Sequence, residues 1–176
     1  MADKKTSDEQ APEAGPEGTG GEQAVPPVMI NAQYVKDLSF EAPTAPGIFS
    51  VMQQQQPDIS ININVDHDVL EGNVSEVVLE FEVRCTAGDD VAFILELQYA
   101  GVFTINVPDE HRIAMLMVEC PRLLFPFARN ILATVSREAG FPPLMLGPVD
   151  FVAMFQNHIQ QQAPAAEGDA AAETES

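Results

Sequence analysis

Apolar and polar positions alternate along three segments in the first half of the chain, residues 59–66, 77–85 and 91–99. The odd-numbered positions carry Ile, Val, Leu, Phe, Cys or Tyr, and most even-numbered positions are polar. A period of two with one polar face is typical of antiparallel strands that are covered on one side only. Residues 87–90 predict a tight turn between the last two strands, and Gly101 is a candidate bulge in the last of them.

A fourth strand is predicted at residues 30–41, ahead of these three. Its buried side chains are expected at even-numbered positions, on one side of the strand: Ile30, Ala32, Tyr34, Leu38 and Phe40. Asp37, Ser39 and Glu41 fall on the other parity, which we expect to face solvent. The strand leads into residues 43–57, a segment with three prolines that predicts a loop, although it carries bulky apolar side chains.

Apolar positions take helical spacing in the second half of the chain. A proline followed by two acidic residues at 108–110 marks the start of a long helix, and Gly140 marks its end. Pro121 and Pro126 lie inside this pattern, and we expect a kink or break there because proline lacks the backbone donor and crowds the preceding turn. A shorter helix is predicted at 149–162.

The element order predicts an α+β domain, in which a four-stranded antiparallel sheet is packed on one face by a long kinked helix and a short C-terminal helix. We place this domain at residues 29–162. Residues 1–28 and 163–176 are acidic, rich in small and polar residues, and poor in large apolar ones, so we expect disordered tails.

The formal net charge is −19, and residues 29–162 contribute to it with 6 Lys and Arg against 17 Asp and Glu. Such a surface repels nucleic acid and anionic lipid and attracts a basic protein partner. The first residues lack the apolar core of a signal peptide, and no segment is long and apolar enough to span a membrane, so we expect a cytoplasmic protein.

The pattern contains little that predicts catalysis. The three histidines stand apart from one another, Cys85 and Cys120 predict buried free thiols, and neither a phosphate loop nor a nucleophile motif is present. We therefore expect no enzyme activity, no metal site and no cofactor.

Two features favour protein binding. Asp37, Glu41, Ile94 and Glu96 all fall on the polar parity of their strands, and an apolar residue among carboxylates suits a basic partner. The alternative is an acidic face that only maintains solubility.

The loop at 43–57 is the second feature. If it crosses the short helix, the gap between them would be lined by Phe and Met, which adapt to unfolded polypeptide. Plain packing under a long loop is the alternative. The chain also carries more apolar side chains than one copy can bury, which argues for self-association, an exposed groove, or both.

Four motifs closely resemble the SecB protein-export chaperones, in the same order and spacing. They are YVKDLSFEAP at 34–43, FILELQYAGVF at 93–103, CPRLLFPFAR at 120–129 and GFPPLMLGPVDFVAMF at 140–155. The similarity covers residues 30–162.

This resemblance implies an ATP-independent holdase that keeps presecretory proteins unfolded and delivers them to the SecA motor. It implies a homotetramer, a dimer of dimers with the sheets outward and the long helices between dimers. The family's SecA-contact positions correspond to Asp37, Glu41, Ile94 and Glu96, with Ile94 where Leu is usual. The zinc in that contact belongs to the basic C-terminal segment of SecA.

A client-binding groove follows from the resemblance together with the chemistry of the loop and the short helix. Its expected residues are Phe49, Val51, Met52, Phe141, Leu144, Phe151, Met154 and Phe155. The main alternative function is an oligomeric acidic adaptor without such a groove.

Overall fold

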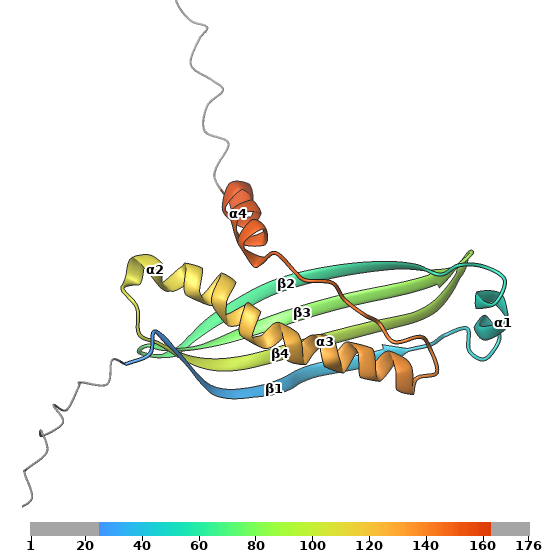
Figure 1. Cartoon of the computed structure of the whole chain (residues 1–176), viewed down its shortest axis with the longest axis horizontal. Helices are drawn as coiled ribbons and strands as arrows, with labels where there is room; N and C mark the ends of the chain where they lie inside the picture. The colour runs from blue at the N-terminus through green and yellow to red at the C-terminus, as the bar shows by residue number, and fades with distance from the viewer. Residues whose placement is uncertain (1–24, 163–176) are drawn as a thin grey trace, which may run out of the picture.

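The computed structural model describes residues 25–162, so the two expected tails fall outside the described residues apart from 25–28. Long strands form one antiparallel sheet in the order β1-β4-β3-β2 (Figure 1). The strands are β1 (Val28–Glu41), β2 (Asp58–Glu71), β3 (Val74–Ala87) and β4 (Asp90–Ile105). The turn predicted at 87–90 is confirmed, since Ala87 pairs with Asp90.

The connection after β1 carries the chain from one edge of the sheet to the other. It contains a short helix, α1 (Ile48–Met52), where the sequence predicted only a loop. Ile48 is buried and anchors this helix at one end of the sheet. Because β2 to β4 then follow as hairpins, both β1 and β2 remain edge strands.

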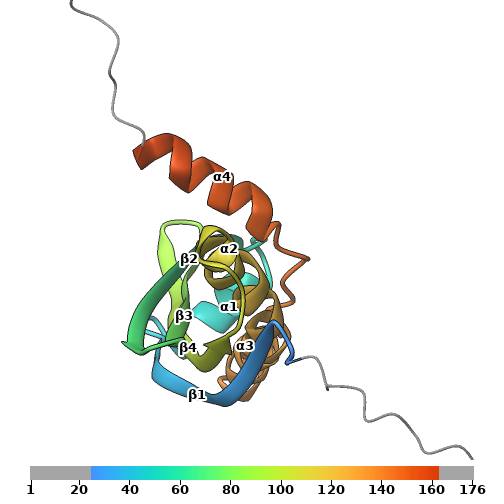
Figure 2. The ribbon, with the colours of Figure 1, turned by 90° about the vertical axis from the view of Figure 1, so that its left-hand side faces the viewer.

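The helices α2 (Asp109–Ala114) and α3 (Cys120–Glu138), joined by the π-helical turn η1 (Met115–Glu119), cover one face of the sheet, here called the inner face, and leave the opposite, outer face bare (Figures 1 and 2). The last helix, α4 (Phe151–Gln162), lies beside η1 and projects beyond the β2 edge of the sheet (Figure 2). The predicted fold class is confirmed.

A stripe of residues four positions apart packs α3 onto the sheet: Cys120, Leu124, Ala128 and Leu132 are all buried. This spacing brings the stripe onto one side of the helix. Gly101 lies beneath it, where a Cβ atom would come within 2.8 Å of Leu124 Cδ2 and 2.7 Å of the Phe103 ring. The bulge expected at Gly101 is wrong, because β4 runs through this residue in register with both neighbours. Glycine is needed there for close helix–sheet contact.

The helix irregularity expected near Pro121 takes the form of η1. The backbone N–H of Cys120 donates to the carbonyl of Met115, five residues back, rather than four. A wider turn of this kind lets the chain enter the proline without breaking the helix. Pro126 lies inside α3, which continues on both sides of it.

The parity predicted for β1 is wrong at Ala32 and Tyr34. Two register shifts put an extra residue of β1 opposite β4, one at Asn31 and one at Lys36. Each such bulge moves the residues beyond it to the other face. Ala32 and Tyr34 therefore pair with outer residues of β4, whereas Leu38 and Phe40 pair with the buried Leu97 and Leu95.

Candidate functional site

The four residues expected to dock a basic partner lie together on the outer face. Glu41 pairs with Ile94 across β1 and β4, and Asp37 pairs with Gln98 further along the same two strands. Between these two pairs, Glu96 lies opposite Ser39, whose hydroxyl lies 3.4 Å from Glu96 Oε2. We call Asp37, Glu41, Ile94 and Glu96 the acidic face.

The outer surface of β3 continues the acidic face. Glu82 pairs with Glu96, and Glu80 pairs with Gln98, so β3 places two further carboxylates directly beside the acidic face. A shallow hollow of about 500 Å³ is lined by Glu82, Ile94 and Glu96 together with Arg84 and Ile61. The polar parity of residues 77–85 was a signal for these glutamates, but only the strand order shows that β3 lies beside β4.

Short polar side chains hold the β3 carboxylates in place. Glu80 accepts hydrogen bonds from Asn64 Nδ2 at 3.0 Å and Gln98 Nε2 at 3.2 Å, and Glu82 accepts one from Asn62 Nδ2 at 3.3 Å. Within residues 25–162, Asp37 and Glu41 show no such partner and are exposed. The edge carboxylates are thus the ones most open to an incoming cation.

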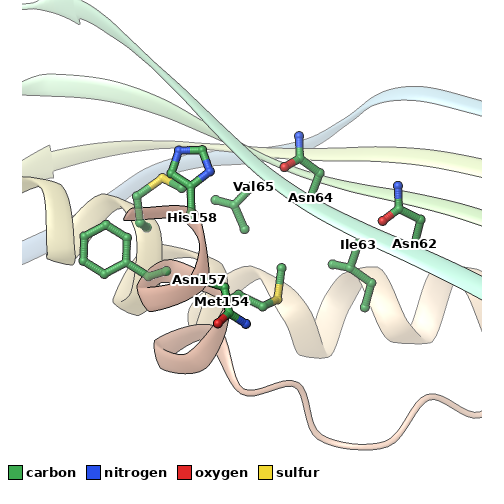
Figure 3. Close-up of a pocket in the computed structure, with 9 residues that line it drawn as sticks. Asn62, Ile63, Asn64, Val65, Met154, Asn157 and His158 are labelled. Atoms are coloured by element: carbon green, nitrogen blue, oxygen red, sulfur yellow. The ribbon is translucent and has the colours of Figure 1, made fainter. Parts of the chain in front are cut away.

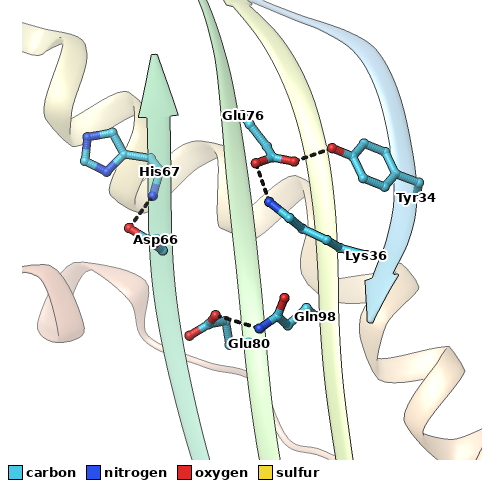
Figure 4. A network of polar contacts seen from close by, with 7 residues as sticks. All are labelled: Tyr34, Lys36, Asp66, His67, Glu76, Glu80 and Gln98. Carbon is cyan, nitrogen blue, oxygen red and sulfur yellow. Dashed lines mark hydrogen bonds and ion pairs between the residues drawn. The ribbon is translucent and has the colours of Figure 1, made fainter. Parts of the chain in front are cut away.

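A buried carboxylate lies further along the outer face (Figure 4). Glu76 on β3 accepts a hydrogen bond from the Tyr34 hydroxyl and pairs with Lys36 Nζ at 2.7 Å. Both donors reach from β1 across β4. The Lys36 and Tyr34 hydrogen bonds lower the pKa of Glu76, and the same contacts raise the pKa of Lys36 and of Tyr34.

An aromatic cluster lies at the end of the sheet that carries α1. The Phe141 ring lies 4.9 Å from that of Phe93 and 5.1 Å from that of Phe49, and Phe40 stacks on Phe93 at 5.5 Å. Phe141 is buried, while Phe49 is 37% exposed. Of the two rings expected in a groove here, only Phe49 offers surface, with half-buried Val51 and Met52 on the same helix.

The segment between α3 and α4 runs along the inner face beside α3 (Figure 1). Leu144 on this segment is buried, and its N–H donates to Ser136 Oγ at 2.9 Å. Phe151, at the start of α4, is 1% exposed and lies edge-on to Phe125 at 5.9 Å. Leu144 and Phe151 therefore belong to the core, although both were expected in the groove.

Met154 and Phe155 lie at a second hollow, between α4 and the free edge of β2 (Figure 3). This hollow has a volume of about 320 Å³. Ile63 and Val65 of β2 and Met117 of η1 complete its apolar lining. The loop at 43–57 does not cross the short helix, because α1 and α4 lie toward opposite ends of the sheet (Figure 1).

An apolar strip on β2 was missed by the sequence analysis. Ile59, Ile61 and Ile63 pair with inner residues of β3, yet Ile59 is 43% and Ile61 is 40% exposed. Their alternation predicted core positions. They remain accessible because β2 is an edge strand, and the strand order could not be read from the pattern. We call Ile59, Ile61 and Ile63 the edge strip.

Apolar surface is also exposed at the other edge and on the long helix. Tyr99 stacks on Phe127 at 6.5 Å, and Phe127 remains 52% exposed. Met29, Val35 and Leu38 of β1 are each more than two-fifths exposed. This surplus matches the expectation that one copy cannot bury all its apolar side chains.

The two cysteine thiols and the possible metal ligands form no further site among the described residues. Burial raises the pKa of the Cys120 thiol to about 12 and also raises that of Cys85. Among residues 25–162, no group of three or more His, Cys, Asp or Glu side chains could hold a metal ion. None of the helices in that range is long and apolar enough to cross a membrane.

Comparison with solved structures supports the fold. A SecB-like chaperone of Mycobacterium tuberculosis, solved in complex with a ChAD peptide from an antitoxin, matches with a TM-score of 0.60 and 14% identity. The match covers 70% of this chain and 91% of that chain.

Comparison with protein families identifies the chain. The family model described as preprotein translocase subunit SecB matches residues 21–162. A protein-export protein SecB of Afipia carboxidovorans is 54% identical over 144 residues, which cover 81% of this chain and 89% of the relative. One of Rhodospirillum rubrum is 49% identical over 154 residues, covering 88% of this chain and 92% of the relative. The resemblance seen in the four motifs is therefore confirmed, and the chain belongs to the SecB family of protein-export proteins.

Proposed function

We propose that this protein is an ATP-independent cytoplasmic chaperone that holds presecretory proteins unfolded and delivers them to SecA. The observation that carries the proposal is the division of one sheet into two accessible surfaces of opposite chemistry. Carboxylates occupy the outer face, whereas partly exposed apolar side chains occupy the edge strip. At the hollow beside α4, the half-buried Met154 and Phe155 lie among the polar side chains of Asn62, Asn64 and Asn157. Each surface suits one of the two partners.

Unfolded chains would bind along the edge strip. Each apolar side chain that a client buries there contributes at most about 1.5–3 kcal/mol, so several weak contacts along one chain are needed. Met154 and Phe155 at the hollow, and Phe49 and Met52 at the other end, extend the apolar surface in both directions. The unpaired edge of β2 also offers backbone groups to an extended segment. The mycobacterial SecB-like chaperone of the same fold was solved with a bound peptide, which supports peptide binding by this fold.

SecA would bind to the acidic face. A basic segment placed over Glu96 and Ile94 gains charge attraction and one apolar contact, and Asp37 and Glu41 supply further carboxylates. Any zinc in this contact would be carried by SecA.

Copies of the chain would associate through the inner surfaces, as a tetramer built from two dimers. The exposed apolar residues on β1 and α3, such as Val35, Leu38 and Phe127, support this assembly. The outer face stays free in such an arrangement, which keeps the acidic face available to SecA.

An aggregation-suppression assay with a chemically denatured preprotein tests the chaperone function. We expect the protein to suppress aggregation without added ATP. An oligomeric acidic adaptor would bind SecA but would leave the aggregation rate unchanged, and that result would replace our proposal. Sedimentation of the same sample gives the mass of the assembly, and a monomer at assay concentration would contradict the tetramer.

Variants of α1 test whether this helix contributes to the client surface. Replacing Phe49 and Met52 together with Ser should weaken client binding and leave SecA binding unchanged, because neither residue belongs to the acidic face. Val69→Ser is a matched control, since Val69 is exposed on β2 beyond the hollow. Equal client affinity in the α1 variant and the control would remove α1 from the client surface.

A further inference from the structure

The bulge at Lys36 places two adjacent residues of opposite charge on the same side of the sheet. Lys36 reaches Glu76 across the outer face, and Asp37 pairs with the outer residue Gln98. In a regular strand, neighbouring side chains point to opposite faces, so this proximity exists only because of the bulge. A cation thus lies directly beside a carboxylate of the acidic face.

Few cations are present on this side of the sheet. Within the four strands, Lys36 and Arg84 are the residues with a permanent positive charge. Lys36 has a flexible four-carbon stem, and its side chain is 42% exposed even when paired. Once released, it can turn to Asp37 and occupy the carboxylate that a basic partner would use.

Glu76 prevents this by holding the ammonium group elsewhere. Its side chain is only 10% exposed, and one of its oxygens accepts from Tyr34 while the other pairs with Lys36. Ala100 is fully buried between these residues on β4, so its small side chain leaves the path from β1 to β3 open. The carboxylate is oriented by Tyr34 and is therefore ready to receive Lys36.

We infer that Glu76 is a positioning residue of the acidic face, which keeps Lys36 away from Asp37 so that Asp37 remains available to SecA. The inference rests on the proposed SecA contact. It assigns Glu76 no contact with SecA itself. Its effect is transmitted through the position of one ammonium group.

The test measures the affinity of purified SecA for the assembled protein at low salt. Glu76→Gln keeps an oxygen for Tyr34 but releases Lys36, and we expect SecA affinity to fall about two- to five-fold, the effect of one exposed ion pair. The double variant Glu76→Gln with Lys36→Met should regain wild-type affinity, because no cation is left to compete.

A matched control separates this effect from a change in overall charge. Asp66 pairs with Val78 across β2 and β3, so Asp66→Asn makes the same charge change at a nearby outer position. We expect it to leave SecA affinity nearly unchanged. Equal losses in Asp66→Asn and Glu76→Gln, or a double variant as weak as Glu76→Gln, would overturn the inference.

The outcome also separates this inference from the docking proposal. If Glu96→Lys leaves SecA affinity unchanged, the acidic face is not the SecA site and the proposed docking fails. If Glu96→Lys weakens binding while Glu76→Gln does not, docking stands and only the role of Glu76 is refuted. Unchanged sedimentation of each variant shows that assembly is intact.

Discussion

Successive residues of β4 belong to two different environments. Leu95 and Leu97 point to the inner face and are at most 1% exposed, while Glu96, between them, points to the outer face and is open to solvent. On β2 the same alternation leads to a different result, since the inner residues Ile59 and Ile61 stay partly exposed. A central strand therefore has one buried and one polar face, whereas the edge strand presents apolar surface that a partner can cover.

Removing bulk beneath α3 should have the largest effect on stability. Leu124→Ala leaves a cavity between α3 and β4, and we expect a loss of about 2–5 kcal/mol in the free energy of unfolding. The matched outer-face variant Glu96→Gln should stay within about 0.5 kcal/mol. Urea unfolding at one fixed protein concentration measures both, and similar losses would show that the two faces do not differ in this way.

Adding a methyl group at Gly101 should have the next largest effect. The new Cβ would overlap the buried Phe103 ring and Leu124, so Gly101→Ala is expected to cost about 1–3 kcal/mol. The control is Gly147→Ala, where a Cβ meets nothing within 4 Å. If both variants unfold at the wild-type urea concentration, the close helix–sheet contact is not needed.

Ser136 tests how firmly the segment after α3 is held on the inner face. Its hydroxyl donates to the Leu132 carbonyl and accepts from the Leu144 N–H, each at 2.9 Å. Ser136→Ala leaves that buried N–H unpaired, and we expect a loss of about 1–3 kcal/mol. Hydrogen exchange at Leu144 should accelerate, and unchanged protection would mean that another group holds the segment.

Acid sensitivity should be smallest and confined to the outer face. The pKa of Glu76 is held below its ordinary value of 4.5, so its contribution is complete above that value and is lost as the pH falls through the lowered pKa. Glu76→Gln should therefore lose less stability than the wild type as the pH falls from neutral to below the ordinary pKa of 4.5. Parallel stability curves for the two proteins would contradict this assignment.

The alternating pattern predicted β2, β3 and β4 well because their period of two is uninterrupted along the residues that face the core. It misplaced Ala32 and Tyr34 because they lie between the bulges at Asn31 and Lys36, and a bulge depends on the pairing with β4, which the sequence of β1 alone does not reveal. Asp37 and Glu41 were placed on the correct face because they follow the second bulge, in phase with Leu38 and Phe40.

Accessibility was harder to predict than element type. Phe141, Leu144 and Phe151 have the chemistry of a client surface, but packing against α3 and the sheet buries them. Ile61 has the same chemistry and stays exposed only because β2 ends the sheet. The difference arises from strand order and from the path of the segment after α3, and neither leaves a periodic signal in the sequence.

The central claim is that the two surfaces of the sheet bind different partners independently. The most direct measurement is the affinity of two variants, Glu96→Lys and Ile59→Ser, for SecA and for an unfolded preprotein. We predict that Glu96→Lys weakens SecA binding, most strongly at low salt, and spares the preprotein, while Ile59→Ser does the reverse. If either variant weakens both partners equally while the assembly keeps its mass, the two surfaces are not separate and the account is wrong.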